Sequence, residues 1–284
     1  MPSMKMIKRR ISSVKNTQQI MKAMNLVAAS KLQKTRSRME NIRPMYDNII
    51  SIMDSIKAKG GISGAPYTEE REVKNIVYVV FTSDRGLCGG YNINVSKEVM
   101  SCIEKNRGVK EKVISVGSKG VEYLRRRNKN ITHRFVGASE TSAYKDAEMI
   151  GNSVISMYNA GDADEAYLIY TRFDSILTHE PKVVKLLPIS PNQDEESSGD
   201  DMAYESDISE FITYAVPLYL NMVIYGAMME SSTCEWASRM TSMDAASRNA
   251  SEIIDDLTLE YNRMRQGMIT QEITEIVSGA NALQ

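Results

Sequence analysis

The chain has 284 residues, a formal net charge of −1 at neutral pH and 42% hydrophobic residues. Its length allows about two ordinary domains, and the near-zero charge excludes a chain-wide preference for acidic or basic partners. The three cysteines, Cys88, Cys102 and Cys234, are an odd number without metal-ligand spacing. That count favours reduced thiols over a disulfide framework or a metal centre.

Residues 4–56 carry apolar side chains at alternating three- and four-residue steps. A 3.5-residue repeat of this length is typical of a coiled-coil helix. We expect the helix to begin near Ser3 and to end in the Gly-rich stretch 57–66, and we expect Pro44, which lies off the repeat, to remove no core contact. The predicted seam is Met4, Ile7, Ile11, Val14, Gln18, Met21, Asn25, Ala28, Leu32, Thr35, Met39, Ile42, Tyr46, Ile49, Met53 and Ile56.

The two ends of the chain carry opposite charge. Residues 1–38 contain ten Lys and Arg and no acid, whereas residues 205–284 contain twelve acids and four Arg. This asymmetry favours pairing of the two helices and marks the first as a surface for acidic partners. Nucleic acid is the alternative partner, but the first aromatic residue is Tyr46, so base-stacking side chains are missing from the basic stretch. A protein partner is therefore favoured.

Strands alternate with helices in the middle of the chain, which indicates a small α/β domain with a mostly parallel sheet. The expected strands are 75–83, 112–117, 134–136, 166–173 and, at an edge, 183–189; the expected helices are 93–106, 119–127 and 143–158. Residues 192–201 are acidic and lack apolar anchors, so we expect a solvated loop there.

The loop 83–92 (SDRGLCGGYN) follows a strand and precedes a helix, where phosphate-binding loops occur. Its glycines fit neither the P-loop nor the G-x-G-x-x-G pattern, so a structural turn with left-handed glycines is favoured over a nucleotide site. Cys88 is a conceivable nucleophile, but no histidine is near it in sequence. We interpret His133 and His179 as surface or strand-edge residues.

A second heptad repeat fills residues 208–283. Its most apolar window, 215–229, is shorter than the roughly 20 residues of a membrane span, so we expect a buried helix flank and no span. Because Pro217 falls a few residues into this helix, the pattern does not define the structure of its first turns. The predicted seam is Ile212, Ala215, Tyr219, Met222, Gly226, Met229, Thr233, Trp236, Met240, Met243, Ser247, Ala250, Ile254, Leu257, Tyr261, Met264 and Met268. Residues 276–284 have no charge, so we expect another protein to bury them.

The chain is similar to one family over its whole length, and three segments together carry the similarity. Residues 7–34 (IKRRISSVKNTQQIMKAMNLVAASKLQK), 82–92 (TSDRGLCGGYN) and 261–283 (YNRMRQGMITQEITEIVSGANAL) resemble the gamma subunit, the central shaft, of F-type ATP synthases. The resemblance implies a mixed α+β architecture: an antiparallel coiled coil of helices 1–58 and 206–284, with an inserted Rossmann-like α/β domain at 59–205. Two departures are Ser206, where proline is common, and Pro217. The regulatory cysteine insertion of chloroplast relatives is absent, so we expect no thiol switch.

The resemblance also implies a non-catalytic rotor subunit that couples ion-driven rotation of the c-subunit ring to ATP synthesis or hydrolysis on the beta subunits. The expected partners are the hexamer of alpha and beta subunits, the epsilon subunit and the c ring, with no nucleic acid. The chain itself is expected to bind no cofactor, since Mg-ATP and ADP bind to the alpha and beta subunits. Its expected place is peripheral, on the cytoplasmic face of the cell inner membrane. The residues determine neither the coupling ion, proton or sodium, nor whether ATP synthesis or ATP hydrolysis dominates.

Carried over residue by residue, the resemblance implies three contact regions. The expected rotor–stator contacts are Met24, Arg239, Arg265, Gln266 and Thr270; the expected tip in the hexamer sleeve is Ile276, Val277, Ala280 and Leu283; the expected c-ring foot is Tyr204 and Glu205. Two alternatives from other classes are a coiled-coil scaffold unrelated to ATP and a small α/β enzyme with helical arms. Co-purification with a nucleotide-bound hexamer would exclude the scaffold, and a substrate titration tests the enzyme.

Overall fold

The computed structural model describes residues 3–58, 67–68, 71–138, 142–189 and 208–282. The chain divides into two compact units. The coil unit consists of Met1–Ala29 and Arg239–Gln284, and the domain unit is Ser30–Ser238. The two long helices, α1 (Met4–Ala58) and α6 (Ile208–Ala282), each contribute residues to both units. Pro44 and Pro217 lie inside these helices, and both side chains leave the heptad seams intact.

The predicted seams are confirmed by the burial of the helices. Every described seam side chain of α1, from Met4 to Met53, is buried or half-buried, whereas most of the residues between them are exposed. The seam of α6 is likewise buried or half-buried from Ile212 to Met264. The prediction is wrong for Met268, which is 49% exposed, because no side chain of α1 is left to cover it.

In the coil unit the two helices run antiparallel, as predicted. Gln18 Nε2 donates to the carbonyl oxygen of Ser247 at 3.3 Å and to Ser251 Oγ at 2.6 Å. One helical stretch further along α1, Asn25 Nδ2 donates to the carbonyl oxygen of Met240 at 2.9 Å. Polar residues inside an apolar seam typically fix its register. Gln18 and Asn25, which interrupt the apolar repeat, therefore align the two helices.

The domain unit contains a five-stranded sheet of order β3-β2-β1-β4-β5. Its elements in chain order are β1 (Asn75–Phe81), α2 (Tyr91–Lys105), β2 (Lys110–Val116), α3 (Ser118–Arg125), β3 (Ile131–Phe135), α5 (Tyr144–Asn159), β4 (Glu165–Phe173) and β5 (His179–Leu187). The first four strands of the order pair in parallel, and β5 pairs antiparallel with β4. The predicted Rossmann-like, mostly parallel sheet is confirmed, and β3 begins three residues earlier than predicted.

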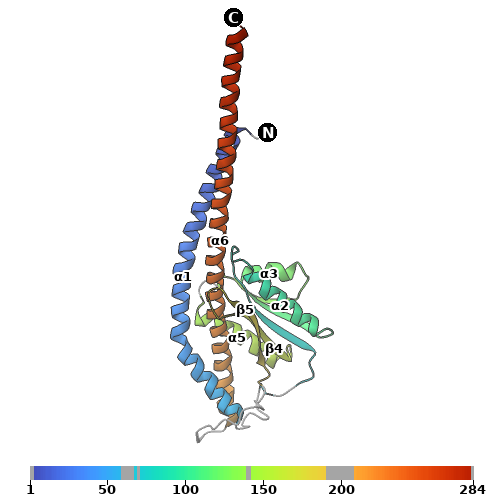
Figure 1. Cartoon of the computed structure of the whole chain (residues 1–284). Helices are drawn as coiled ribbons and strands as arrows, with labels where there is room; N and C mark the ends of the chain where they lie inside the picture. Colours follow the sequence, from blue (N-terminus) through green and yellow to red (C-terminus); the bar gives the residue numbers. More distant parts are fainter. Residues whose placement is uncertain (1–2, 59–66, 69–70, 139–141, 190–207, 283–284) are drawn as a thin grey trace. The chain divides into compact units, whose positions relative to one another are not determined.

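Each face of the sheet packs on helices (Figure 1). On one face Ile76, Tyr78 and Val80 of β1 meet the apolar sides of α2 and α3. On the other face Val77, Val79 and Phe81 meet α5 and the residues of α6 from Ile212 to Met228. Central parallel strands are buried on both faces, which explains why β1 reads as an unbroken apolar run in the sequence.

The apolar stretch of α6 lies in this core. By length and composition alone, α6 contains a stretch that could cross a membrane, but 56% of its most apolar window is buried inside the protein. Core helices of soluble proteins have the same composition. Val216, Leu220 and Ile224 pack under the sheet while Met222 and Met229 lie on the heptad side. The predicted buried flank is confirmed.

Candidate functional surfaces

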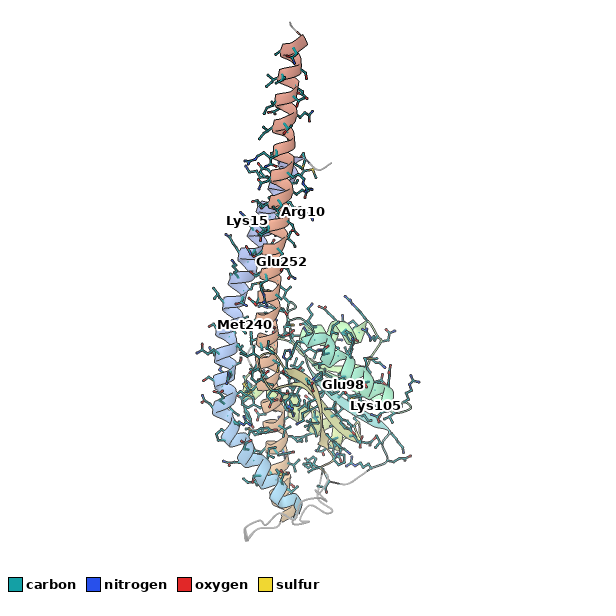
Figure 2. All side chains as sticks on the ribbon, in the orientation of Figure 1. Arg10, Lys15, Glu98, Lys105, Met240 and Glu252 are labelled. Atoms are coloured by element: carbon teal, nitrogen blue, oxygen red, sulfur yellow. The ribbon has the colours of Figure 1, made fainter. Side chains whose placement is uncertain are left out.

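The basic side chains of α1 from Lys5 to Arg43 face solvent. The ten Lys and Arg of the first 38 residues are exposed, among them Arg10 and Lys15, which lie on the outside of the helix pair as does Glu252 of α6 (Figure 2). Within residues 4–29 and 239–281, Arg248 pairs with Asp244 of the same helix, and no described cation of α1 in this range pairs with an acid of α6. The pairing of the helices therefore depends on the apolar seam, and the cations of α1 stay available to an acidic surface.

The expected rotor–stator residues differ in exposure. Met24 is half-buried, whereas Arg265, Gln266 and Thr270 are exposed on α6. Thr270 Oγ1 donates to the carbonyl oxygen of Gln266 at 2.9 Å, a bond within the helix that leaves both side chains outward. Arg239 is only 5% exposed. A partner can therefore touch little of Arg239. The heptad pattern does not predict this burial, because it depends on contacts that are distant in sequence.

The last turns of α6 have no buried residue from 265 to 281. This end nevertheless carries large apolar side chains: Met268 is 49% exposed, Ile273 56%, Ile276 71% and Val277 53%. Ala280 is exposed as well. An apolar helix surface of this kind is costly in water and marks an interaction site. Leu283 of the expected tip, and Tyr204, Glu205 and Ser206 at the expected foot, lie outside the described residues.

The Gly-rich loop after β1 is packed against α6. Ser238 Oγ of α6 donates to the carbonyl oxygen of Cys88 at 2.7 Å, and Cys88 and Tyr91 form a buried cluster with Cys234. Burial raises the pKa of Tyr91 well above its ordinary value, and Glu235 adds to the effect. Asn92 closes the loop, since its Nδ2 donates to Ser83 Oγ at 2.7 Å and to Cys88 Sγ at 3.1 Å. The loop is thus a structural anchor.

Ligands of open α/β sheets bind beside the carboxyl ends of the strands where the strand order reverses. Here that place lies between β1 and β4, and α6 fills it. Thr171 N–H donates to Ser231 Oγ at 3.4 Å and Cys234 Sγ donates to the carbonyl oxygen of Thr171 at 3.5 Å. A nucleotide would have to displace these contacts, so the geometry does not support the enzyme alternative.

The carboxylate of Asp84 occupies the hydrogen-bond donors that a bound phosphate would need. It accepts from the N–H and hydroxyl of Ser118, both at 3.0 Å, and from the N–H of Gly137 at 3.0 Å. These donors lie at the start of α3 and after β3. Anions bind at such helix starts, but here the anion belongs to the chain itself. Within the loop, Gly89 has a positive φ as predicted, yet the second such residue is Leu87, not Gly86 or Gly90.

The remaining candidates for chemistry have structural surroundings. Cys88, Cys102 and Cys234 are free thiols, and burial raises the pKa of the Cys102 and Cys234 thiols, which disfavours the thiolate. His133 and His179 lie on β3 and β5, the two edges of the sheet, as predicted. In the described part of the chain, no three His, Cys, Asp or Glu side chains gather in a way that could hold a metal ion.

Comparison with known proteins gives matches along the whole chain. A family model described as ATP synthase matches residues 3–283. The ATP synthase gamma chain of Alkaliphilus metalliredigens is 42% identical over 98% of both chains. That of Pelotomaculum thermopropionicum is 41% identical over 100% of both. A gamma chain of Acetobacterium woodii described as sodium ion specific is 39% identical, over 98% of this chain and 97% of the relative.

Two solved structures are similar to this chain in fold. The central stalk and c-ring structure of Tetrahymena thermophila mitochondrial ATP synthase contains a chain that is 27% identical, with a TM-score of 0.61 and coverage of 80% of this chain and 99% of that one. A chain of the Euglena gracilis mitochondrial ATP synthase superposes with a TM-score of 0.68 over 99% of this chain and 94% of that one, at 18% identity, which shows the fold alone.

Proposed function

Since the chain belongs to the family of ATP synthase gamma chains, we propose that it is the central-stalk rotor subunit of an ion-translocating ATP synthase. The identity of 42% over 98% of both chains is the observation that carries this proposal. Rotation of the c ring is coupled through this chain to conformational changes at the catalytic sites of the beta subunits, where Mg-ATP is made or hydrolysed. The chain is part of a membrane-associated complex and lies peripherally at the cytoplasmic face.

The exposed surfaces suit a shaft that touches its partners unequally. A rotating subunit shifts a catalytic site between states only if it contacts those states with different free energy. The outward cations of α1 favour acidic elements of the surrounding hexamer. Arg265, Gln266 and Thr270 supply polar contacts on α6, and Met24 and the edge of Arg239 complete the proposed rotor–stator set.

The proposed tip has a different chemistry. Ile276, Val277 and Ala280 lie on an exposed helix end, and Leu283 follows. Burial of apolar area in a sleeve stabilises at about 25 cal/mol per Å² but supplies no directional bonds. The tip therefore holds the shaft on its axis, and the polar contacts at 265–270 transmit most of the torque. Tyr204 and Glu205 are proposed to contact the c ring together with the epsilon subunit beside them.

The coupling ion is not decided by this chain. A sodium-specific relative and relatives described without an ion differ little in identity, at 39% and 42%. The ion binds to other subunits, so a rotor shaft carries no residue that must change with it.

Single-molecule rotation of the assembled complex tests the proposal. Deletion of residues 278–284 should leave a complex that assembles and rotates more slowly at saturating ATP. Arg265→Ala and Gln266→Ala should lower the torque while assembly is retained, because they remove polar contacts and little apolar area. Arg263→Ala is the matched control, since Arg263 is an exposed cation on the same helix outside the proposed contacts.

Two outcomes would contradict this division of roles. If the truncated complex assembles but does not rotate, the tip carries the torque. If Arg265→Ala and Arg263→Ala lower the torque equally, the effect is one of net charge and not of the proposed contact. Failure of the purified chain to join alpha and beta subunits at all would refute the rotor assignment itself.

A further inference from the structure

A groove in the domain unit lies beside the carboxyl end of β4. It has a volume of about 420 Å³ and is formed by α1, the end of β4 and α6. We name it the β4 groove. Its apolar lining is Met39, Ile42 and Tyr46 of α1, Phe173 of β4 and Met229 of α6, and its charged lining is Arg43, Asp47, Arg172, Asp174 and Glu230. Small-molecule sites are typically about 300–1,000 Å³ in volume, and the β4 groove falls within that range.

Tyr46 and Gly226 explain why this space is open. A Cβ at Gly226 would lie 2.8 Å from Tyr46 Cε2 and 2.9 Å from Cδ2, so the ring would have to shift if residue 226 were not glycine. The ring lies against the helix backbone, and the groove continues along α1 to Met39.

Glu230 is a half-buried carboxylate without an ion pair in the described part of the chain. Its Oε2 accepts only a long hydrogen bond, 3.4 Å, from the N–H of Phe173. Burial raises its pKa, and Asp174 adds to this, while the Phe173 N–H, Lys182 and Arg172 act in the opposite direction. An ionised group that loses water without a close counter-charge is costly. A cation bound beside it would recover that cost.

The other charges of the groove already have partners. Arg172 pairs with Asp174 at 2.9 Å, and Arg43 lies 4.0 Å from Asp47. Among the side chains that line the groove, two arginines face three acids, so Glu230 carries the unmatched negative charge; Lys182, outside the lining, is the further cation that acts on it. This balance disfavours an anionic ligand such as a phosphate, and it favours a cation.

We propose that the β4 groove binds a small organic cation, an amine or guanidine with an aromatic or aliphatic body. The cationic group pairs with the Glu230 carboxylate, and the body lies between Phe173, Met229 and the ring of Tyr46. A cation near that ring gains a further attraction from its π face. The proposal is independent of the rotor function, because none of these residues belongs to the proposed rotor–stator contacts, tip or foot.

Titration of 2-phenylethylammonium tests the proposal, with the neutral 2-phenylethanol as its matched probe. Binding is measured by saturation-transfer NMR on the assembled complex and on the full chain alone. The ammonium probe should bind roughly tenfold more tightly than the alcohol, and Glu230→Gln should remove that difference. Glu252→Gln, which neutralises an exposed acid elsewhere on α6, should change nothing.

The pH dependence is a second readout that needs no variant. Deprotonation of Glu230 creates the binding charge, so affinity for the ammonium should rise with pH through the raised pKa of Glu230, whereas the alcohol should show no such rise. Equal affinity for both probes, or tight ammonium binding by Glu230→Gln, would overturn the proposal. If the full chain binds the ammonium but the complex does not, a partner subunit covers the groove and the small-ligand proposal is wrong.

Discussion

Two stretches of the same helix, residues 212–238 and 239–281 of α6, share one heptad repeat but not one environment. In the first stretch the seam faces α1 and the opposite side packs under the sheet, so even Ser231, Thr233 and Glu235 are buried. In the second stretch only one side of the helix is covered, and beyond Met264 no side of the described helix is covered. The repeat therefore specifies a partner helix, and the residues between its positions specify whether a second partner exists.

Small residues lie where residues 212–238 of α6, which are covered on two sides, pack against their neighbours. Substitution of these small residues is the sharpest test of the difference between the two stretches. Gly151 of α5 lies so close to α6 that an added Cβ would collide with Asn221 Oδ1. Asn221 is 7% exposed, and that oxygen has no hydrogen-bond partner in the described structure. Gly151→Ala should destabilise the domain unit by about 2 kcal/mol, since overpacking outweighs the gain in helix propensity. Faster hydrogen exchange of α5 in the assembled complex would show this.

A double-mutant cycle separates the collision from other effects of Gly151→Ala. Asn221→Ala removes the amide that the new methyl group meets, so the double variant should be more stable than Gly151→Ala alone. Strict additivity of the two changes would mean that the collision is not the cause.

Gly226→Ala should have a smaller effect in the same stretch. Its new methyl group meets the ring of Tyr46, the edge atoms of which lie at 2.8 and 2.9 Å. A half-buried ring can shift by a few tenths of an ångström, so we expect a loss of about 1 kcal/mol. Chemical denaturation of the full chain followed by tyrosine fluorescence measures it. A gain in stability would show that Tyr46 moves without cost and that the β4 groove is adaptable.

Much of this fold follows from periodicity, because burial repeats with the geometry of each element. The 3.5-residue repeat predicted which side chains of α1 are covered, and the apolar run in β1 predicted a buried strand. The sheet order and the antiparallel pairing of β5 depend on long-range contacts, and neither was predicted from the sequence.

The site was harder to predict where tertiary contacts decide exposure. Arg239 follows the family pattern in the sequence, but packing buries it to 5% exposure. Neither Asp84 nor Glu230 belongs to a sequence motif. Only the fold brings the N–H groups of Ser118 and Gly137 to the carboxylate of Asp84. Likewise, only the fold places apolar side chains beside Glu230. The structural role of the Gly-rich loop was foreseen from its failure to match phosphate motifs, whereas its attachment through Ser238 was not.

In the singly covered stretch the polar seam residues should matter less than the glycines of the domain unit. Gln18→Ala removes two hydrogen bonds, to the carbonyl oxygen of Ser247 and to Ser251 Oγ. Since the site is half-exposed, water replaces part of the loss, and we expect about 0.5–1 kcal/mol. Gln19→Ala, one residue along and fully outward, is the control and should be neutral. Hydrogen exchange of residues 14–25 distinguishes them; equal protection would mean that Gln18 does not set the register.

The uncovered end of α6 should tolerate what the buried stretch does not. Nothing lies within 4 Å of a Cβ added at Gly267, so Gly267→Ala meets no collision in this chain. Alanine is the better helix former by about 1 kcal/mol, but an isolated helix end frays, so the measured gain should stay at about 0.5 kcal/mol or less. Thermal unfolding of the full chain checks this.

The same variant in the assembled complex then reports on the partner subunits, because Gly267 is next to Gln266. If rotation slows while the stability of the chain alone is unaffected, the stator approaches the helix backbone at this turn. Unchanged rotation would leave the proposed contacts to the side chains of Arg265, Gln266 and Thr270 alone.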